Sequence, residues 1–418
     1  MCGIVGYSGP KEPLPILING LSRLEYRGYD SAGIAISDGN KITIEKKEGK
    51  LDVLKEHLKN NQMSGNVGIG HTRWATHGIP NDVNAHPHSD NNEEFAIIHN
   101  GIIENYAEIK KDLLNEGFEF KSDTDTEVVA VELSRKWSGE LLKTVVDVAN
   151  SLEGTYALLV TTTKEEGTIV AGRLMSPLVL GVGDDEVFLA SDSAAILEHT
   201  KKMIFLENGD FVEIKNGKYK LFDSDLNEIE REIQEIDWEV SEAEKSGYDH
   251  FMYKEILEQS EVIERTISGR LDTNSDDIPI MSDHASKFEK IWIVACGTAY
   301  HAGLFGKDLF EKVLGVPVSV ELASEFRYRE PIVGKNDLGI VISQSGETMD
   351  TIAATELLKE NGSHVLALVN VVGSSLARMA DSVFYLHVGP EIGVASTKAY
   401  LGMLVSCLLY TSDAADDL

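Results

Sequence analysis

The sequence predicts two folded parts of different class: a layered α+β part followed by a doubly wound α/β part. The length of 418 residues is too great for one ordinary domain. The first half carries short β-rich segments, punctuated by Gly and Asn, with helical segments between them. The second half alternates continuous apolar strands with helices, as parallel sheets covered on both faces do.

In the first half, nine segments have strand character: "CGIVGYSG", "SAGIAIS", "KITIEKKEG", "GNVGIGHTRWATHG", "EFAIIHNGII", "YALLVTTT", "GTIVAG", "PLVLGVG" and "EVFLASD". Apolar residues at helical spacing predict a helix over "PLPILINGLSRLEYRG". A second helix is expected over "DTDTEVVAVELSRKW", which starts at a capping Asp or Thr and has Glu127 in its first turn. Many strands with long helices favour largely antiparallel sheets in layers.

In the second half, "YDHFMYKEILEQSEVIERTISGRL" is predicted to form one helix. Four strand–turn–helix segments follow, beginning at "KIWIVACGTA", "DLGIVISQSGET", "HVLALVNVVG" and "SVFYLHVGPEIG". We expect the first domain over residues 2–220, an acidic connecting segment over 221–245 and the second domain over 246–418. Parallel sheets of this kind bind ligands at the carboxyl ends of their strands.

Charge and cysteine content limit the class of protein. The net charge of −31 disfavours nucleic acid and anionic membranes as partners. Three cysteines in so long a chain make no disulfide framework, which indicates a reducing compartment. The first residues lack a signal-peptide pattern, and the apolar run at 399–409 is too short to span a bilayer. We therefore expect a cytoplasmic protein.

Two turns of the second half have the composition of a phosphate site. "SQSGET" (residues 343–348) follows a strand and opens a helix, so its hydroxyls and free helix-start amides can donate to an anion. It is no nucleotide P-loop, because no Gly-Lys-Ser/Thr follows. "CGTA" (296–299) occupies the equivalent turn of the preceding segment. Either turn alone could be an ordinary capped helix start, but two in one sheet favour a phosphorylated small molecule.

Cys2 directly follows the initiating methionine. Loss of Met1 would leave an α-amine on Cys2, with a pKa near ~7.7–8.0, that could act as the base for its own thiol. The alternative is an inert terminal thiol. Cys296 and Cys407 lie in apolar runs, where cysteine commonly packs as a small buried hydrophobe.

Polar turns at the ends of predicted strands could form a substrate-binding pocket next to the Cys2 thiol. They are "YRGYDSAG" (26–33), "GHTRWATHG" (70–78), "HNGIIENY" (99–106) and "SDTDTE" (122–127). Arg73 can pair with a carboxylate and Asp125 with an ammonium, while Asn100 and the amide of Gly101 could form an oxyanion hole. This set suits an α-amino acid whose side-chain carbonyl meets a thiol.

His86 and His88, in "NAHPHS", have the His-x-His spacing of some metal sites. No third ligand converges with them in the sequence, so we expect no metal and no cofactor.

These motifs together resemble a known family. "MCGIVGY", "RGYDSAG", "GHTRWATHG", "HNGIIENY" and "DTDTEV" are similar to the glutaminase domain of the N-terminal-nucleophile amidotransferases. With "ACGTAYHAG", "SQSGETMDT" and "EIGVASTKAY", the chain resembles the glutamine–fructose-6-phosphate aminotransferases, or glucosamine-6-phosphate synthases, from Cys2 to about Tyr400. The resemblance implies an αββα glutaminase sandwich followed by an incomplete sugar-phosphate isomerase (SIS-type) domain.

The resemblance also implies the chemistry. Processed Cys2 attacks the amide of glutamine and releases ammonia through a thioester, and the ammonia converts fructose 6-phosphate to glucosamine 6-phosphate, the first step of hexosamine synthesis. No cofactor is implied, and the full-length protein is expected to form a homodimer.

Residue roles carry over by motif. Asn100 and Gly101 are implied to stabilise the oxyanion, and Trp74 to gate an ammonia channel. Arg27 is implied to belong to the ordered structure around the nucleophile. The residues implied to hold glutamine are Arg73, Thr76, His77, Gly101 and Asp125. Those implied to contact the sugar phosphate are Thr298, Ser343, Gln344, Ser345, Thr348, Val394 and Ser396. Ala299 stands where many members have Ser.

The end of the chain departs from the family. The implied second sugar-phosphate domain and tail have no counterpart, and "TSDAADDL" is expected to break the apolar helix before it. We therefore expect a C-terminally truncated member with glutaminase activity only. An alternative is a non-catalytic sugar-phosphate sensor with a glutaminase-like domain. Asparagine synthetases and phosphoribosyl-pyrophosphate users are disfavoured, because their Ser-Gly-Gly-x-Asp-Ser and Arg-Gly-Thr motifs are missing.

Overall fold

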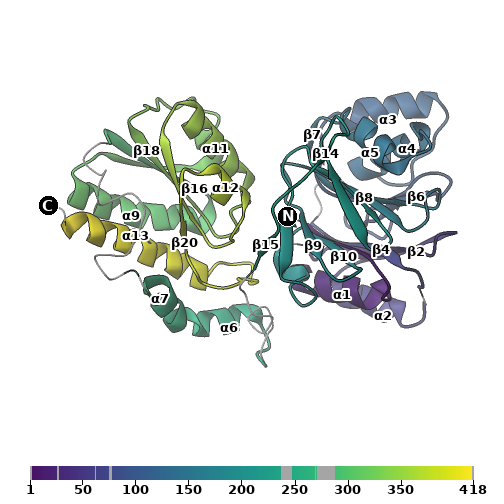
Figure 1. Ribbon diagram of the computed structural model, residues 1–418, viewed down its shortest axis with the longest axis horizontal. Helices are drawn as coiled ribbons and strands as arrows, with labels where there is room; N and C mark the ends of the chain where they lie inside the picture. The colour runs from purple at the N-terminus through teal and green to yellow at the C-terminus, as the bar shows by residue number, and fades with distance from the viewer. Residues whose placement is uncertain are drawn as a thin grey trace. The chain divides into compact units, whose positions relative to one another are not determined.

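The structure, a computed structural model, describes residues 2–25, 28–61, 63–74, 78–236, 247–268, 270 and 288–416, with side chains as far as Tyr410. The chain divides into two compact units, Met1–Asp237 and Trp238–Leu418 (Figure 1). They are called the N-terminal and the C-terminal unit below.

The N-terminal unit contains two sheets in which every strand pairing is antiparallel. The first sheet has the order β15-β11-β9-β10-β1-β4-β2-β3 and the second the order β14-β13-β12-β8-β7-β6-β5. The first comprises β1 (Gly3–Ser8), β2 (Ser31–Ser37), β3 (Ile42–Glu48), β4 (Val67–Arg73), β9 (Val179–Val182), β10 (Val187–Ala190), β11 (Lys202–Phe205) and β15 (Gln234–Glu235). The second comprises β5 (His88–Ser89), β6 (Phe95–Ile103), β7 (Gly154–Thr162), β8 (Thr168–Leu174), β12 (Phe211–Lys215), β13 (Lys218–Phe222) and β14 (Glu228–Ile229).

The two sheets pack face to face, and helices cover their outer faces. Ile69 of β4 lies in the core between the sheets together with Ile98 of β6, whereas Gly68 and Gly70 face outward, where Leu17 and Leu21 of α1 approach them closely. The helices are α1 (Pro13–Leu24) and α2 (Leu51–Leu58) on the first sheet and α3 (Tyr106–Asn115), α4 (Asp125–Arg135) and α5 (Leu141–Ala149) on the side of the second. A short helix, η2, spans Ser193–Ala195. This is the expected αββα sandwich.

The C-terminal unit is built on a five-stranded, fully parallel sheet in the order β17-β16-β18-β19-β20. Its strands are β16 (Lys290–Ala295), β17 (Val318–Leu322), β18 (Asp337–Ser343), β19 (His364–Val369) and β20 (Ser382–Tyr385). Its helices are α6 (Phe251–Leu257), α7 (Gln259–Ile267), α9 (Gly297–Leu314), α10 (Ala323–Phe326), α11 (Met349–Glu360), α12 (Ser375–Met379) and α13 (Lys398–Asp416).

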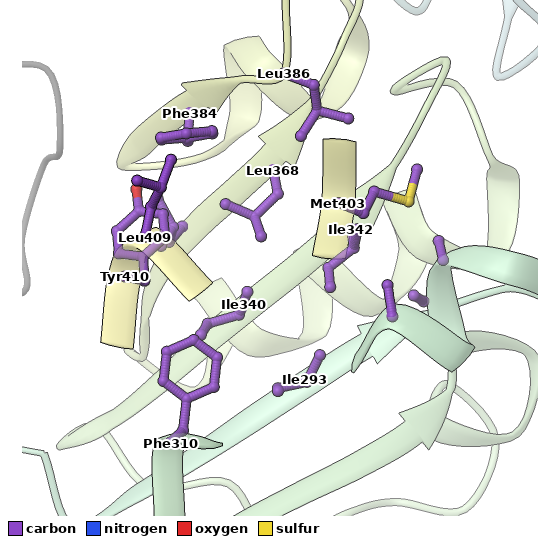
Figure 2. Packing of buried hydrophobic residues seen from close by; sticks show 14 of the residues in the cluster. Ile293, Phe310, Ile340, Ile342, Leu368, Phe384, Leu386, Met403, Leu409 and Tyr410 are labelled. Atoms are coloured by element: carbon purple, nitrogen blue, oxygen red, sulfur yellow. The ribbon is translucent and has the colours of Figure 1, made fainter. Parts of the chain in front are cut away.

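Both faces of this sheet are buried, as the continuous apolar strands predict. On one face, Ile340 and Ile342 pack with Phe310 of α9 and Met403 of α13 (Figure 2). On the other face, the alternate residue Val341 packs with α10, α11 and α12. The predicted doubly wound α/β architecture is confirmed.

Some local expectations are wrong. The helix expected over residues 248–271 is two helices, α6 and α7, which meet at Glu258. The backbone stays helical through Asp416, so the polar end does not break α13. Cys296 is half-buried at the N-cap of α9 rather than buried.

The acidic segment 221–245 contributes β14 and β15, which lie at the edges of different sheets. Its part from 237 on lies outside the described residues. Among the helices that the structure describes, none is long and apolar enough to cross a membrane.

Candidate active site

Cys2 lies where β1 begins, beside the end of β4. Gly3 pairs with Thr72 across these antiparallel strands, so Cys2 reaches the residues that follow β4. The backbone N–H of Trp74 donates to Sγ of Cys2 at 3.2 Å, and Sγ is 3.6 Å from the carbonyl oxygen of Trp74. The thiol is therefore held by the backbone of the "HTRWATH" motif.

Asn100 approaches Cys2 from the other sheet. It lies in β6, and its Nδ2 donates to the carbonyl oxygen of Cys2 at 2.9 Å. Oδ1 of Asn100 lies 2.9 Å from Nε2 of His71, which is on β4. The two predicted catalytic residues thus meet at the place where the two sheets are joined by side-chain hydrogen bonds.

The backbone conformation and the space at Gly101 do not allow a residue with a side chain at this position. Its φ is +130°, and a Cβ there would lie 2.0 Å from the carbonyl oxygen of Thr155 on β7. Glycine is required at this position by backbone conformation and by space.

The predicted glutamine-binding residues Arg73 and Asp125 are both buried, and each makes at least one hydrogen bond. Nη2 of Arg73, the last residue of β4, donates to the carbonyl oxygen of Gly78 at 3.4 Å. Asp125 is the first residue of α4, and its Oδ2 accepts the N–H of Ile103 at 2.9 Å. Thr124 caps this helix by accepting the N–H of Glu127.

Trp74, the predicted gate, is 45% exposed. Its ring meets that of Tyr29 edge to face, with 5.2 Å between the centroids. The sequence motifs included Tyr29 without assigning it a role. Arg27, Thr76 and His77 lie outside the described residues.

The surroundings of Cys2 shift the pKa of its thiol in opposite directions, and burial dominates. Burial raises the pKa of Cys2, whereas the hydrogen bond from the Trp74 backbone and the charge of Arg73 lower it. The charge of Asp30 acts in the same direction as burial. A base is therefore needed to generate the thiolate for reaction.

A group of buried histidines lies behind this site, and no sequence motif predicted that their rings would meet. The ring of His86 stacks on His71 at 4.3 Å and meets His88 edge to face at 4.7 Å. Nε2 of His86 contacts Oγ1 of Thr126 at 2.9 Å, and Nε2 of His88 contacts Oγ1 of Thr124 at 3.1 Å. Within the described part of the chain, no group of three or more His, Cys, Asp or Glu side chains could hold a metal ion.

In the C-terminal unit, the two phosphate-type turns lie side by side. Ala295 of β16 pairs in parallel with Ile342 of β18, so the turns that follow emerge at the same sheet edge. β17 lies on one side of β16 and β18 on the other, so the strand order reverses at this point. Open α/β sheets bind ligands at such a switch point.

Hydrogen bonds organise the turn at 343–348. Oγ of Ser343 lies 3.1 Å from Oγ1 of Thr348 and accepts the N–H of Gly346. Oγ of Ser345 accepts the N–H of Glu347 at 3.1 Å. Thr298 is exposed in the first turn of α9, where Ala299 is buried, and Gln344 is half-buried. The hydroxyls of three predicted residues are thus gathered at the start of α11.

Val394 and Ser396 lie farther along the chain, between β20 and α13. Val394 is 71% exposed, and Oγ of Ser396 donates to Glu391 at 2.8 Å. Among the described residues, no hydrogen bond joins Ser396 to the turn at 343–348, so the structure does not link these two parts of the predicted sugar site.

Comparison with known proteins identifies the family. Residues 57–245 match the family model described as a glutamine amidotransferase domain, and residues 285–412 match that of the SIS domain. The glutamine–fructose-6-phosphate aminotransferase [isomerizing] of Clostridium acetobutylicum is 49% identical over 97% of this chain and 67% of its own length. That of Caldanaerobacter subterraneus subsp. tengcongensis is 50% identical over 99% of this chain and 69% of its own length. The chain belongs to this aminotransferase family.

A solved structure extends the likeness of fold beyond the aminotransferases. The structure titled "Structure of the allosteric regulatory enzyme of purine biosynthesis" matches with a TM-score of 0.50 at 18% identity, over 96% of this chain and 94% of that one. At this identity the match concerns the fold alone. The chain spans 67–69% of the length of the two aminotransferases named above, and the expected truncation stays a prediction.

Proposed function

We propose that this chain hydrolyses L-glutamine with Cys2 as nucleophile, and that in the full-length protein the ammonia passes to fructose 6-phosphate, the reaction for which its relatives are named. The proposal rests on two hydrogen bonds that join Cys2 to motifs remote from it in the sequence. The N–H of Trp74 donates to its Sγ, and Nδ2 of Asn100 donates to its carbonyl oxygen.

The reaction follows from the groups at this point. Loss of Met1 frees the α-amine of Cys2, which accepts the thiol proton. Sγ then forms a bond to the side-chain carbonyl carbon of glutamine, and the carbonyl electron pair moves onto oxygen. Collapse of this intermediate breaks the C–N bond, and the α-ammonium returns its proton to the departing ammonia. Water hydrolyses the resulting thioester, releasing glutamate and restoring the thiol.

Asn100 and Gly101 are proposed to stabilise the oxyanion, through Nδ2 and the backbone N–H respectively. Loss of one such donor typically lowers kcat by about 10²–10³-fold. Arg73, with Thr76 and His77, is proposed to hold the glutamine carboxylate, and Asp125 its ammonium. A buried guanidinium and a buried carboxylate suit these opposite charges.

In the C-terminal unit, the proposed ligand is fructose 6-phosphate at the switch point between β16 and β18. The start of α11 supplies helix-start amides, and Ser343, Ser345 and Thr348 supply hydroxyls for the phosphate. The other residues proposed to contact the sugar phosphate are Thr298, Gln344, Val394 and Ser396.

For this chain, glutaminase turnover is the activity proposed, and one experiment tests it. Intact mass spectrometry is expected to show loss of Met1, and the wild-type chain is expected to release glutamate from glutamine. Cys2→Ala is expected to abolish this release, whereas Cys296→Ala, a matched change at another thiol, retains it. Assay of glucosamine 6-phosphate in the same samples tests the aminotransfer.

Two outcomes would overturn the proposal. One is a retained methionine with undiminished glutaminase activity, and the other is full activity of Cys2→Ala. A chain that binds fructose 6-phosphate without hydrolysing glutamine would instead support the non-catalytic sensor.

A further inference from the structure

His71 holds the oxyanion residue Asn100 through a side-chain contact of defined direction. Nε2 of His71 lies 2.9 Å from Oδ1 of Asn100 and 3.1 Å from the carbonyl oxygen of His99. Both partners can only accept, so Nε2 carries the proton and donates it to them. In neutral His71, Nδ1 then carries no proton.

The direction of this bond decides which end of the Asn100 amide faces Cys2. The nitrogen and oxygen of a carboxamide have nearly the same shape, so packing alone does not orient it. With Oδ1 held by His71, Nδ2 is directed to Cys2, where it donates to the carbonyl oxygen at 2.9 Å. A flipped amide would set Nδ2 against the Nε2–H of His71, donor against donor, and would turn Oδ1 toward Cys2.

We propose that His71 is a positioning residue for glutamine hydrolysis, and that the hydrogen bond from its Nε2–H to Oδ1 of Asn100 fixes the oxyanion donor toward the nucleophile. The inference rests on the function proposed above. Among the described residues, no hydrogen bond joins His71 to Cys2, whereas one joins it to Asn100, so the role proposed for His71 is exerted through Asn100.

The surroundings of His71 favour the neutral tautomer that this role needs. The side chain is 1% exposed, and its ring stacks on that of His86. Burial is the main cause that lowers its pKa to about 3; the nearby charges of His99 and Arg73 act in the same direction, and the hydrogen bonds to Asn100 and to the His99 carbonyl only partly oppose them. Nδ1 has no hydrogen-bond partner among the described residues, so a second proton there would be buried without an acceptor.

Variants of His71 test the role by glutaminase kinetics. His71→Met, which keeps bulk and removes the donor, is expected to lower kcat by about 10–100-fold, no more than loss of an oxyanion donor, with little change in KM. His71→Gln places an amide N–H near the position of Nε2 and is expected to restore most of kcat. Added to Asn100→Ala, His71→Met is expected to cause no further loss, because its effect passes through Asn100.

His88→Met is the matched control. His88 is buried in the same group of rings, but its Nε2 contacts Thr124 rather than Asn100. It is expected to lower thermal stability and keep kcat. Unchanged kcat in His71→Met, or a full additional loss when it is combined with Asn100→Ala, would overturn the proposal.

A measurement on the wild-type chain needs neither variants nor turnover. With ¹⁵N-labelled histidine, NMR is expected to show His71 neutral and protonated at Nε2 near neutral pH. An Nδ1-protonated or cationic ring would overturn the positioning role even if the variants failed to fold. Absence of glutaminase activity in the wild type would overturn the proposed function instead, so the two failures are distinguishable.

Discussion

The carboxylate of Asp125 accepts the backbone N–H of Ile103, with 2.9 Å between Oδ2 and N. Asp125 opens α4, and Ile103 ends β6, the strand that carries Asn100 and Gly101. The residue proposed to bind the substrate ammonium is therefore fixed to the strand proposed to stabilise the oxyanion.

Two substitutions of Asp125 separate its roles. Asp125→Asn keeps an acceptor for Ile103 and loses the charge, so KM for glutamine is expected to rise about 10–100-fold with stability little changed. Asp125→Ala loses both and is expected to cost a further ~1–3 kcal/mol of unfolding free energy, because a buried N–H is left unpaired. Glutaminase kinetics and urea unfolding check this. Equal kinetics of Asp125→Asn and the wild type would contradict the ammonium-binding role.

Gly101→Ala is expected to destabilise the N-terminal unit strongly. A residue other than glycine is strained at a φ of +130°, and its Cβ would lie 2.0 Å from the Thr155 oxygen. We expect a loss of about 2–6 kcal/mol in urea unfolding. Gly139→Ala is the control, because φ is +96° there and no atom lies within 4 Å of the added Cβ. Similar losses in the two variants would show that the close approach to Thr155 is unimportant.

Thr348→Val tests the phosphate site by removing one hydroxyl at nearly constant shape. Affinity for fructose 6-phosphate, measured by calorimetry, is expected to fall about 10–100-fold, as for loss of a hydrogen bond to a charged group. Thr355→Val is the same change farther along α11, where the hydroxyl donates to the Thr351 carbonyl oxygen instead. Equal affinities of both variants would place the phosphate elsewhere.

The buried histidines predict a loss of stability in mild acid. Burial lowers the pKa of His71, His86 and His88 in the folded chain, whereas unfolded histidines titrate near ~6.5. The unfolded state therefore takes up protons that the folded state does not, and stability falls as the pH drops below ~6.5, for His71 down to about 3. Each residue contributes up to about 1.4 kcal/mol per pH unit.

Urea unfolding at about pH 7.5, 6.5 and 5.5 measures this slope. His88→Gln offers an amide to Thr124 in place of the imidazole. It is expected to reduce the slope of stability against pH by up to the contribution of one histidine, about 1.4 kcal/mol per pH unit. Stability that stays constant down to about pH 5.5 would contradict the account.

The sequence predicted those parts of the site that local motifs specify. Asn100 and Gly101 come from one strand end, and Thr124 caps α4 in the way its spacing from Glu127 indicates. The role of His71 could not be predicted, because its contact with Asn100 joins two sheets and depends on their packing. Spacing alone presented His86 and His88 as metal candidates, whereas their Nε2 atoms contact threonines of the segment that opens α4.

In the C-terminal unit too, the sequence predicted only those features of the fold that local pattern specifies. The parallel sheet and the burial of both its faces followed from pattern, whereas β17 was not among the four strands expected. The break between α6 and α7 did not follow from pattern, because Glu258 is neither Gly nor Pro. Its carboxylate instead pairs with Lys398 at 2.6 Å, a contact across 140 residues that no local pattern reveals. The polar residues after Tyr410 lack an apolar repeat, yet the backbone there remains helical.

The central claim is that Cys2, freed of Met1, is the nucleophile for glutamine. Its most direct test is to treat the chain with an electrophilic glutamine analogue and map the adduct by peptide mass spectrometry. The account predicts one adduct, on an N-terminal peptide that begins at Cys2, with glutamine protecting against it. An adduct on Cys296 or Cys407, or one on Cys2 with Met1 still attached, would contradict it.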